Sequence, residues 1–212
     1  MDLVYFITGL RPVEVSLKGV KGKFPNGNEA FMWSHGRVMW ENGALLSVIN
    51  GLGYPNAAAG SNDQGMVLYC EGNDQTGLIF HDDHYRGVAY SYLQDIGPGG
   101  SKYNYASPDF YRLVPWEGAG YKPIGYGYES VAGITQAIHR LESAAAGLAP
   151  AAAIAKRRQM ILEVDAQGLI ATPANSYINE LVVEAARASI LADAAPMRIV
   201  YSGHPHVERS SG

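Results

Sequence analysis

The chain has 212 residues, which is enough for one large domain with its own hydrophobic core. Apolar residues make up 47% and charged residues 17%, a composition that excludes an intrinsically disordered chain. The net charge of −4, with 16 basic residues that form no cluster, argues against a nucleic-acid-binding or polybasic membrane surface. The single cysteine rules out an internal disulfide and indicates a reducing, cytoplasmic compartment, and no apolar run is long enough to span a membrane.

The first half of the chain has the alternation and the turn residues of β-strands. Residues 13–20 alternate apolar and polar side chains, and the segments 29–40 and 44–51 flank Glu41-Asn42-Gly43. An Asn-Gly pair between apolar strands is a strong signal for a β-hairpin. Three further strands are expected at residues 66–70, 78–80 and 88–93.

Two of these strands are apolar on both faces, which is unusual for a sheet with one solvated face. Leu46 and Val48 share one face of the strand 44–50, whereas Leu45 and Ile49 share the other. Helices are expected to cover one face of the sheet. The other face would be a large apolar patch, so a second copy of the chain is predicted to cover it.

The second half has the apolar spacing of three helices, at residues 129–146, at 151–164 and after Thr172-Pro173. The first helix is expected to carry Val131, Ile134, Ile138 and Leu141 on one face. Asn175 or Ser176 is expected to cap the third helix, whose predicted inner face is Ile178, Leu181, Val182, Ala185 and Ser189.

The two ends complete the predicted fold. Residues 1–9 read as the end of a helix capped by Gly9, and residues 197–201 read as a short final strand. Strands in a run followed by helices in a run predict an α+β fold. We expect a single domain over residues 1–208, built on an open, mostly antiparallel sheet of about six to seven strands with helices on one face. Residues 209–212 are expected to be an artificial or disordered tail.

Four segments, taken in chain order, carry a resemblance to a known family. They are residues 2–15 (DLVYFITGLRPVEV), 38–44 (VMWENGA), 181–189 (LVVEAARAS) and 198–200 (RIV). Together they resemble the junction helix, the first hairpin, the terminal helix and the final strand of the C-terminal domain in the Gfo/Idh/MocA oxidoreductase family. The resemblance covers nearly the whole chain.

This resemblance implies an NAD(P)-dependent oxidoreductase of sugars, polyols or related hydroxy compounds, whose C-terminal sheet commonly mediates oligomerisation. The family's nucleotide-binding Rossmann domain has no counterpart, because no G-x-G-x-x-G motif follows a strand. The family's Glu-Lys-Pro motif and its catalytic histidine have no match, and Asp2 alone matches the signature helix. The resemblance therefore implies a truncated chain that binds no cofactor itself and is inactive alone.

The densest cluster of ionisable residues is His81-Asp82-Asp83-His84. His81, Asp83 and His84 could bind a metal, but a closed metal site needs more ligands. The favoured interpretation is a polar hairpin tip between Phe80 and Val88. Cys70, in an apolar strand, is expected to be a buried small hydrophobic residue.

Residues 96–124 are rich in Gly, Pro and Tyr without any period, so a long functional loop is expected there. Its aromatic and polar side chains suit carbohydrate, because rings stack on sugar faces while Asp and Arg bind hydroxyl groups. The candidate substrate-binding residues are Tyr105, Asp109, Arg112 and Tyr126. In the alternative interpretation, the tyrosines pack the loop onto the domain.

Two functions other than an oxidoreductase domain stay open. The first is a stand-alone binding or assembly module that uses the open sheet. The second is a hydrolase of sugars, esters or lactones, although the chain has no G-x-S-x-G nucleophile motif.

Overall fold

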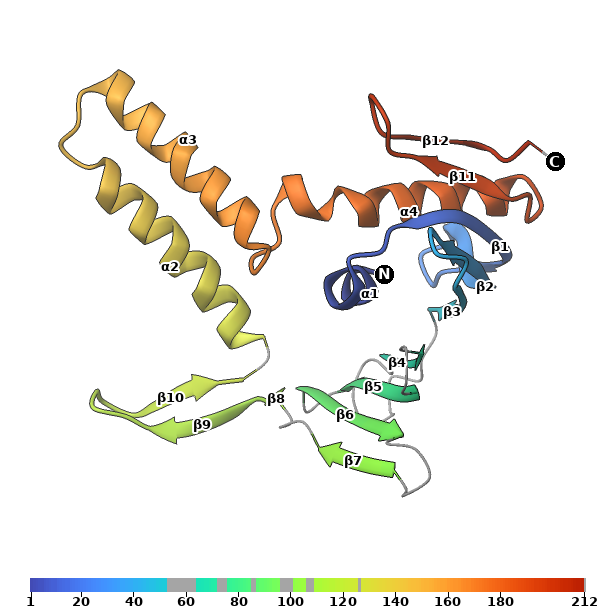
Figure 1. The fold of residues 1–212 in the computed structure, drawn as a ribbon, viewed down its shortest axis with the longest axis horizontal. Helices are drawn as coiled ribbons and strands as arrows, with labels where there is room; N and C mark the ends of the chain where they lie inside the picture. Colours follow the sequence, from blue (N-terminus) through green and yellow to red (C-terminus); the bar gives the residue numbers. More distant parts are fainter. Residues whose placement is uncertain are drawn as a thin grey trace. The chain divides into compact units, whose positions relative to one another are not determined.

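The computed structural model describes residues 1–52, 64–71, 76–84, 87–95, 101–105, 109–125 and 127–211. Within these ranges, residues 83–84, 87–90, 92–95, 101–105 and 109–110 are described by their backbone alone. The chain forms two compact units, Met1–Gly53 with Asp165–Gly212 and Tyr54–Val164 (Figure 1). The expectation of one domain over residues 1–208 stays a prediction.

The first unit is built on an antiparallel sheet of five strands in the order β12-β11-β1-β2-β3. The strands are β1 (Pro12–Lys23), β2 (Glu29–Trp40), β3 (Leu45–Gly51), β11 (Met197–Val200) and β12 (His206–Arg209). The hairpin predicted around Asn42-Gly43 is confirmed, with Gly43 at a φ of 85°, where glycine has no side chain to clash.

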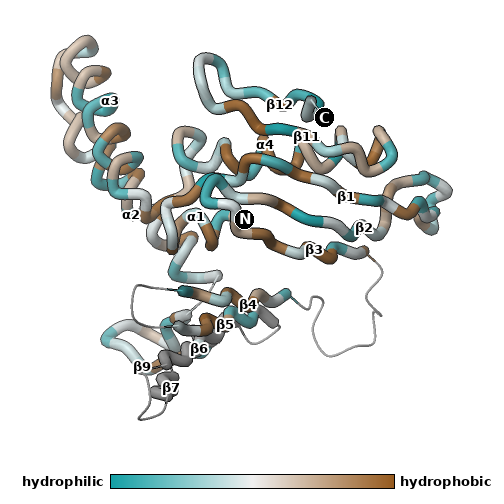
Figure 2. The backbone as a smooth tube through the Cα atoms, turned by 45° about the vertical axis from the view of Figure 1, so that its right-hand side comes forward, coloured by the Kyte–Doolittle hydropathy of each residue, from teal (hydrophilic) through white to brown (hydrophobic). Residues whose placement is uncertain are grey.

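One helix, α4 (Pro173–Leu191), packs on this sheet and closes the core of the unit (Figure 2). All five residues predicted for its inner face are buried, which confirms the helical spacing: Ile178, Leu181, Val182, Ala185 and Ser189. The buried residues of the sheet include Val15, Leu17, Val38, Trp40, Met197 and Ile199.

The cap of α4 differs from the prediction of Asn175 or Ser176. Thr172 is the N-cap residue, and Asn175 is the third helical residue of a capping box in which Thr172 N–H donates to Asn175 Oδ1 at 2.9 Å. Pro173, with no N–H to satisfy, takes the first helical position, so the N-cap is the residue directly before it, Thr172.

The short helix α1 (Asp2–Thr8) confirms the prediction for the N-terminal segment. Gly9 ends it with a φ of 70°, and its N–H donates to Tyr5 O at 2.7 Å. At the C-terminus, where the sequence predicts an artificial or disordered tail, Arg209 is the last residue of β12, and the N–H of Ser210 donates to Pro196 O at 3.0 Å. Arg209 pairs with Met197, and Ser210 Oγ donates to Glu14 Oε2 at 3.0 Å, so β12 covers the outer edge of β11.

The second unit contains a sheet in which β4 (Gln64–Glu71), β5 (Thr76–His84), β6 (Gly87–Asp95) and β7 (Ser101–Tyr105) are neighbours and β8 (Asp109–Phe110) also pairs with β6. A separate hairpin follows, formed by β9 (Arg112–Pro115) and β10 (Tyr121–Ile124). The long loop predicted at residues 96–124 is therefore wrong, since β7 to β10 lie within it.

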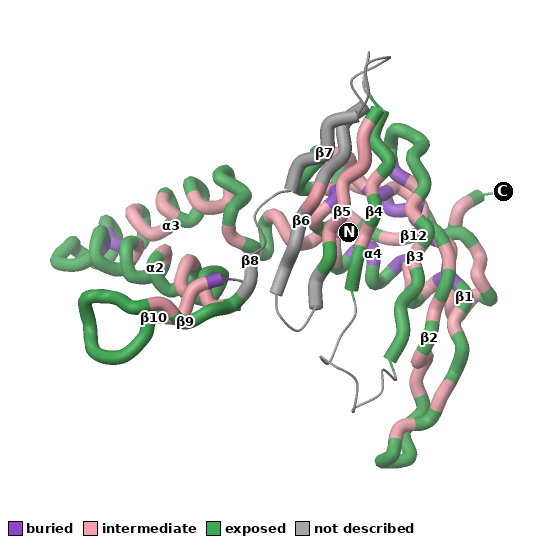
Figure 3. The backbone as a smooth tube through the Cα atoms, turned by 90° about the horizontal axis from the view of Figure 1, so that it is seen from below, coloured by how far each residue is buried: buried purple, intermediate pink, exposed green. Residues whose placement is uncertain are grey.

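Two helices complete the second unit, α2 (Tyr128–Ala145) and α3 (Pro150–Gln167), whose last turn belongs to the first unit. Most of both helices is exposed or only partly buried (Figure 3), and the exposed residues include the apolar Val131, Ile134 and Ile138 of α2. None of the described helices is both long enough and apolar enough to cross a lipid bilayer.

The α+β class is confirmed, but the strands do not join into one sheet of six to seven. The described strands belong to two five-stranded sheets and one two-stranded hairpin, all antiparallel. Alternation and turn residues predict strands and hairpins because both signals are local. They carry no information on which strands from distant parts of the chain share a sheet.

Candidate functional site

The predicted substrate-binding residues lie in the second unit, where the backbone register brings two of them to one strand. Tyr105 pairs with Ser91 and Asp109 pairs with Val88, both on β6. Arg112 follows at the start of β9, where it is exposed and pairs with Ile124. Tyr126 lies outside the described residues.

The hairpin predicted between Phe80 and Val88 is present as the antiparallel pair β5–β6, but β5 continues through His84, so residues 81–84 belong to the strand and not to the tip. His81 lies within the sheet, opposite Met66 on β4 and Tyr90 on β6. Consecutive side chains of a strand point to opposite faces, so the partly buried His81 and the exposed Asp82 do not act together. Among the described side chains, no three His, Cys, Asp or Glu residues lie close enough to hold a metal ion.

Two other residues singled out in the sequence are exposed. Asp2 is the first residue of α1, where a carboxylate interacts favourably with the helix dipole. Burial lowers the pKa of the neighbouring Met1 amino group, and the Asp2 carboxylate opposes this shift. Cys70 is exposed rather than buried, because it lies near the end of β4, the edge strand of its sheet.

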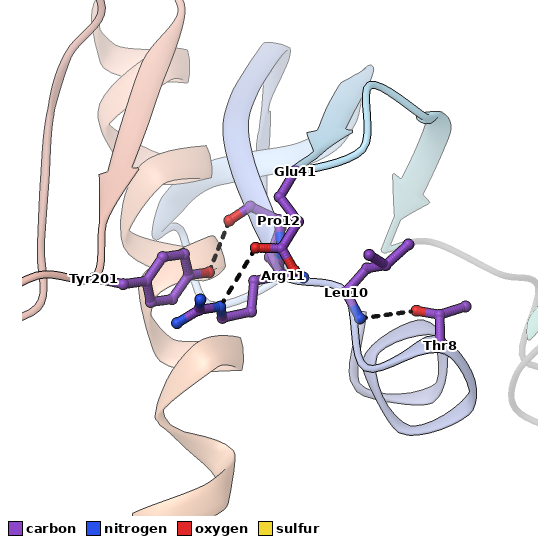
Figure 4. Close-up of polar contacts among 6 residues, drawn as sticks. All are labelled: Thr8, Leu10, Arg11, Pro12, Glu41 and Tyr201. Atoms are coloured by element: carbon purple, nitrogen blue, oxygen red, sulfur yellow. Dashed lines mark hydrogen bonds and ion pairs between the residues drawn. The ribbon is translucent and has the colours of Figure 1, made fainter.

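A polar cluster that the sequence did not indicate fixes the connection between α1 and β1 (Figure 4). Arg11 N–H donates to Glu41 Oε1 at 3.0 Å, and Arg11 Nε lies 3.6 Å from Glu41 Oε2. The Arg11 guanidinium also lies over the Tyr201 ring, 4.9 Å from its centroid. The Tyr201 hydroxyl donates to Pro12 O at 2.7 Å, so three elements meet at residues 11 and 12.

This cluster is suited to holding backbone rather than to proton transfer. Burial raises the pKa of the Tyr201 hydroxyl, with Tyr177 adding to the shift, so the hydroxyl remains a neutral donor to Pro12 O. Arg11 and Glu41 compensate each other's charge. On the α1 side, Thr8 Oγ1 accepts the N–H of Leu10 at 3.1 Å, which fixes the exit of the chain from the helix.

The first unit also has an open sheet face, which we define by Val20, Trp33, Leu45 and Ile49. Trp33 is 49% exposed, Leu45 64% and Ile49 84%, whereas Val38, whose side chain points to the other face of β2, is 1% exposed. The register aligns Ile49 with His35 and Val20 with Trp33, which places these side chains on the face opposite that of Val38. The strands predicted to be apolar on both faces, β2 and β3, therefore have one face toward the core and one exposed face.

Comparison with known proteins adds no relative: no protein family, curated protein or solved structure matches the chain.

Proposed function

We propose that the chain is a substrate-binding and oligomerisation domain of an NAD(P)-dependent oxidoreductase that acts on sugars or polyols. The order of elements supports this proposal. Helix α1 leads through Gly9 into β1, an Asn-Gly hairpin joins β2 to β3, and α4 packs on the sheet before β11. These are the segments, in the same order, on which the resemblance to the Gfo/Idh/MocA family rests.

The open sheet face is the observation that carries the proposal. Trp33, Leu45 and Ile49 are exposed together on one sheet face. Monomeric proteins usually expose apolar residues singly, so a group of them on regular strands suggests an interface. Tryptophan is also enriched at protein–protein interfaces. A second copy of the chain, packed against this face in a symmetric dimer, would remove these side chains from water.

Substrate binding is proposed for Tyr105, Asp109, Arg112 and Tyr126. The exposed aromatic residues Tyr111, Trp116 and Tyr121 on and beside the β9–β10 hairpin support a carbohydrate ligand, because aromatic rings stack on sugar faces. Arg112 would supply hydrogen-bond donors for sugar hydroxyl groups.

Binding of NAD(P) is proposed for another part of the enzyme or for a separate chain. A dinucleotide site is built on parallel strands joined by a helix, and the strand pairs of the described residues are antiparallel. A cytoplasmic location is proposed as well, since a reducing compartment keeps an exposed thiol such as that of Cys70 from forming disulfides.

Sedimentation velocity tests the observation that carries this function. The wild-type chain is expected to sediment as a dimer, and Ile49→Arg, which places a charge on the open sheet face, is expected to give monomers. Leu162→Arg is the matched control, because Leu162 is 68% exposed on α3 and lies outside that face. A monomeric wild-type chain, or equal dissociation in both variants, would refute assembly through this face.

A stand-alone assembly module is the second candidate, because the open sheet face favours it equally. The two candidates differ in ligand binding. A dimer that binds no sugar or polyol in calorimetric titration would favour the stand-alone module over the oxidoreductase domain.

A further inference from the structure

The sheet of the first unit has an internal strand whose outer edge is only partly paired. β1 extends over Pro12–Lys23, but β11 pairs with it only at Glu14 and Val15. From Ser16 onwards, none of the described strands therefore pairs with the β1 edge that faces away from β2. An unpaired edge of this kind is a template for the addition of a strand from another chain.

A buried serine of α4 takes the place of the missing strand. Ser189 Oγ accepts the backbone N–H of Leu17 at 3.0 Å and lies 3.5 Å from Leu17 O, to which it donates. One hydroxyl thus satisfies both main-chain groups of Leu17, as a neighbouring strand would. Ser189 is a buried polar residue of the core, and an apolar residue there would leave the Leu17 N–H without this acceptor.

The turn after α4 continues this cover along β1. Ser16 Oγ donates to Ala194 O at 2.9 Å, and Lys18 forms an ion pair with Asp193. Asp193 and Ala194 have φ angles of 58° and 70°, a conformation that costs non-glycine residues about 1 kcal/mol or more each. The backbone bonds Ala194 N–H to Ser189 O and Asp193 N–H to Ile190 O hold the turn in this form.

We infer that Ser189, Asp193 and Ala194 act as an edge cover, a built-in device that blocks the addition of a strand to β1 by another copy of the chain. The remainder of the same edge is protected differently. An irregularity in register between Val20 and Lys21 interrupts the ladder, and Lys21 and Lys23 place charges there. The edge cover thus protects the regular stretch that the irregularity and the lysines leave open.

Hydrogen exchange and sedimentation of Ser189→Ala test this inference, which does not depend on the proposed function. Loss of the hydroxyl is expected to speed exchange of the Leu17 amide by about tenfold relative to other β1 amides, the effect of one lost hydrogen bond. Species larger than the wild-type species are expected to appear with rising concentration. Val182→Ala is the matched control, because it removes buried volume from the same helix face and leaves the edge cover intact.

A second variant keeps the test decisive if Ser189→Ala does not fold. Ser16→Ala removes the hydrogen bond to Ala194 O from the sheet side and leaves α4 unchanged. It is expected to produce larger species to a smaller extent than Ser189→Ala. The inference is overturned if the soluble serine variants form no species larger than the wild-type species. It is also overturned if Val182→Ala speeds Leu17 exchange and promotes association as much as Ser189→Ala does.

Discussion

Glu41 binds both main-chain polar groups of Arg11. Its carboxylate accepts the Arg11 N–H at 3.0 Å, and its own N–H donates to Arg11 O at 3.0 Å. Residue 41 begins the turn between β2 and β3, so the turn is tied to the chain that enters β1. The Glu41 side chain and backbone thus both help to set the direction in which the chain passes from α1 into β1.

Removal of this carboxylate is expected to lower stability moderately. Glu41→Ala loses the hydrogen bond to Arg11 N–H and the partly exposed ion pair, which together contribute about 1–2 kcal/mol. Chemical denaturation followed by circular dichroism measures the loss. Glu117→Ala, at an exposed residue after β9, is the control and is expected to change the free energy of unfolding by less than about 0.5 kcal/mol.

Gly36 is expected to tolerate no side chain. It pairs with Leu17, and a Cβ at this position would overlap Ser16 O and lie 2.7 Å from Leu17 Cα. Both are backbone atoms, so Gly36→Ala must push β1 and β2 apart, at a cost of about 2 kcal/mol or more. Gly133→Ala is the opposite case, because Gly133 lies within α2 with open space around it, and a gain of about 0.5–1 kcal/mol is expected. Equal effects of the two substitutions on thermal unfolding would contradict this close approach of β1 and β2.

A glycine at residue 194 is expected to stabilise the protein. Ala194 has a φ of 70°, and glycine adopts this conformation without a steric penalty. Ala194→Gly should raise the free energy of unfolding by about 0.5–1 kcal/mol and preserve the hydrogen bond from Ser16 Oγ to the backbone oxygen. Ala192 has a φ of −99°, which carries no steric penalty for alanine, so Ala192→Gly only adds the conformational entropy cost of glycine and should lower the free energy of unfolding.

The helical spacing of α4 and the Asn-Gly hairpin were predictable because each depends on neighbours in sequence. Ile178, Leu181 and Val182 repeat at helical intervals and are buried as a set. The edge cover and the Arg11 cluster were not predictable, because Leu17 and Ser189 are 172 residues apart and Arg11 and Glu41 are 30 apart. The strands of residues 101–124 were not predicted because none of them has more than five residues, which is too short for a clear alternation of apolar and polar side chains. Of the four candidate substrate residues, only Arg112 has a described side chain, so their joint role stays a prediction.

The pKa of Glu142 is expected to lie below its ordinary value because its carboxylate accepts two hydrogen bonds from Arg157, from Nε at 3.0 Å and from Nη2 at 2.7 Å. A carboxylate with a lowered folded-state pKa stabilises the protein above its unfolded-state pKa. That contribution disappears as the pH falls through the folded-state value. A carbon-detected NMR titration should show the pKa of Glu142 below the ordinary value of a glutamate carboxyl, and Arg157→Gln should raise it. A Glu142 titration unchanged by Arg157→Gln would contradict this ion pair.

Isothermal titration calorimetry of the chain with hexoses, polyols, NADH and NADPH tests the proposed function most directly. Saturable binding of at least one sugar or polyol is expected, weakened about tenfold or more by Arg112→Ala through the loss of charged hydrogen bonds, with no binding of either nucleotide. Saturable binding of NADH to the chain alone, or of no sugar or polyol at all, would contradict the account.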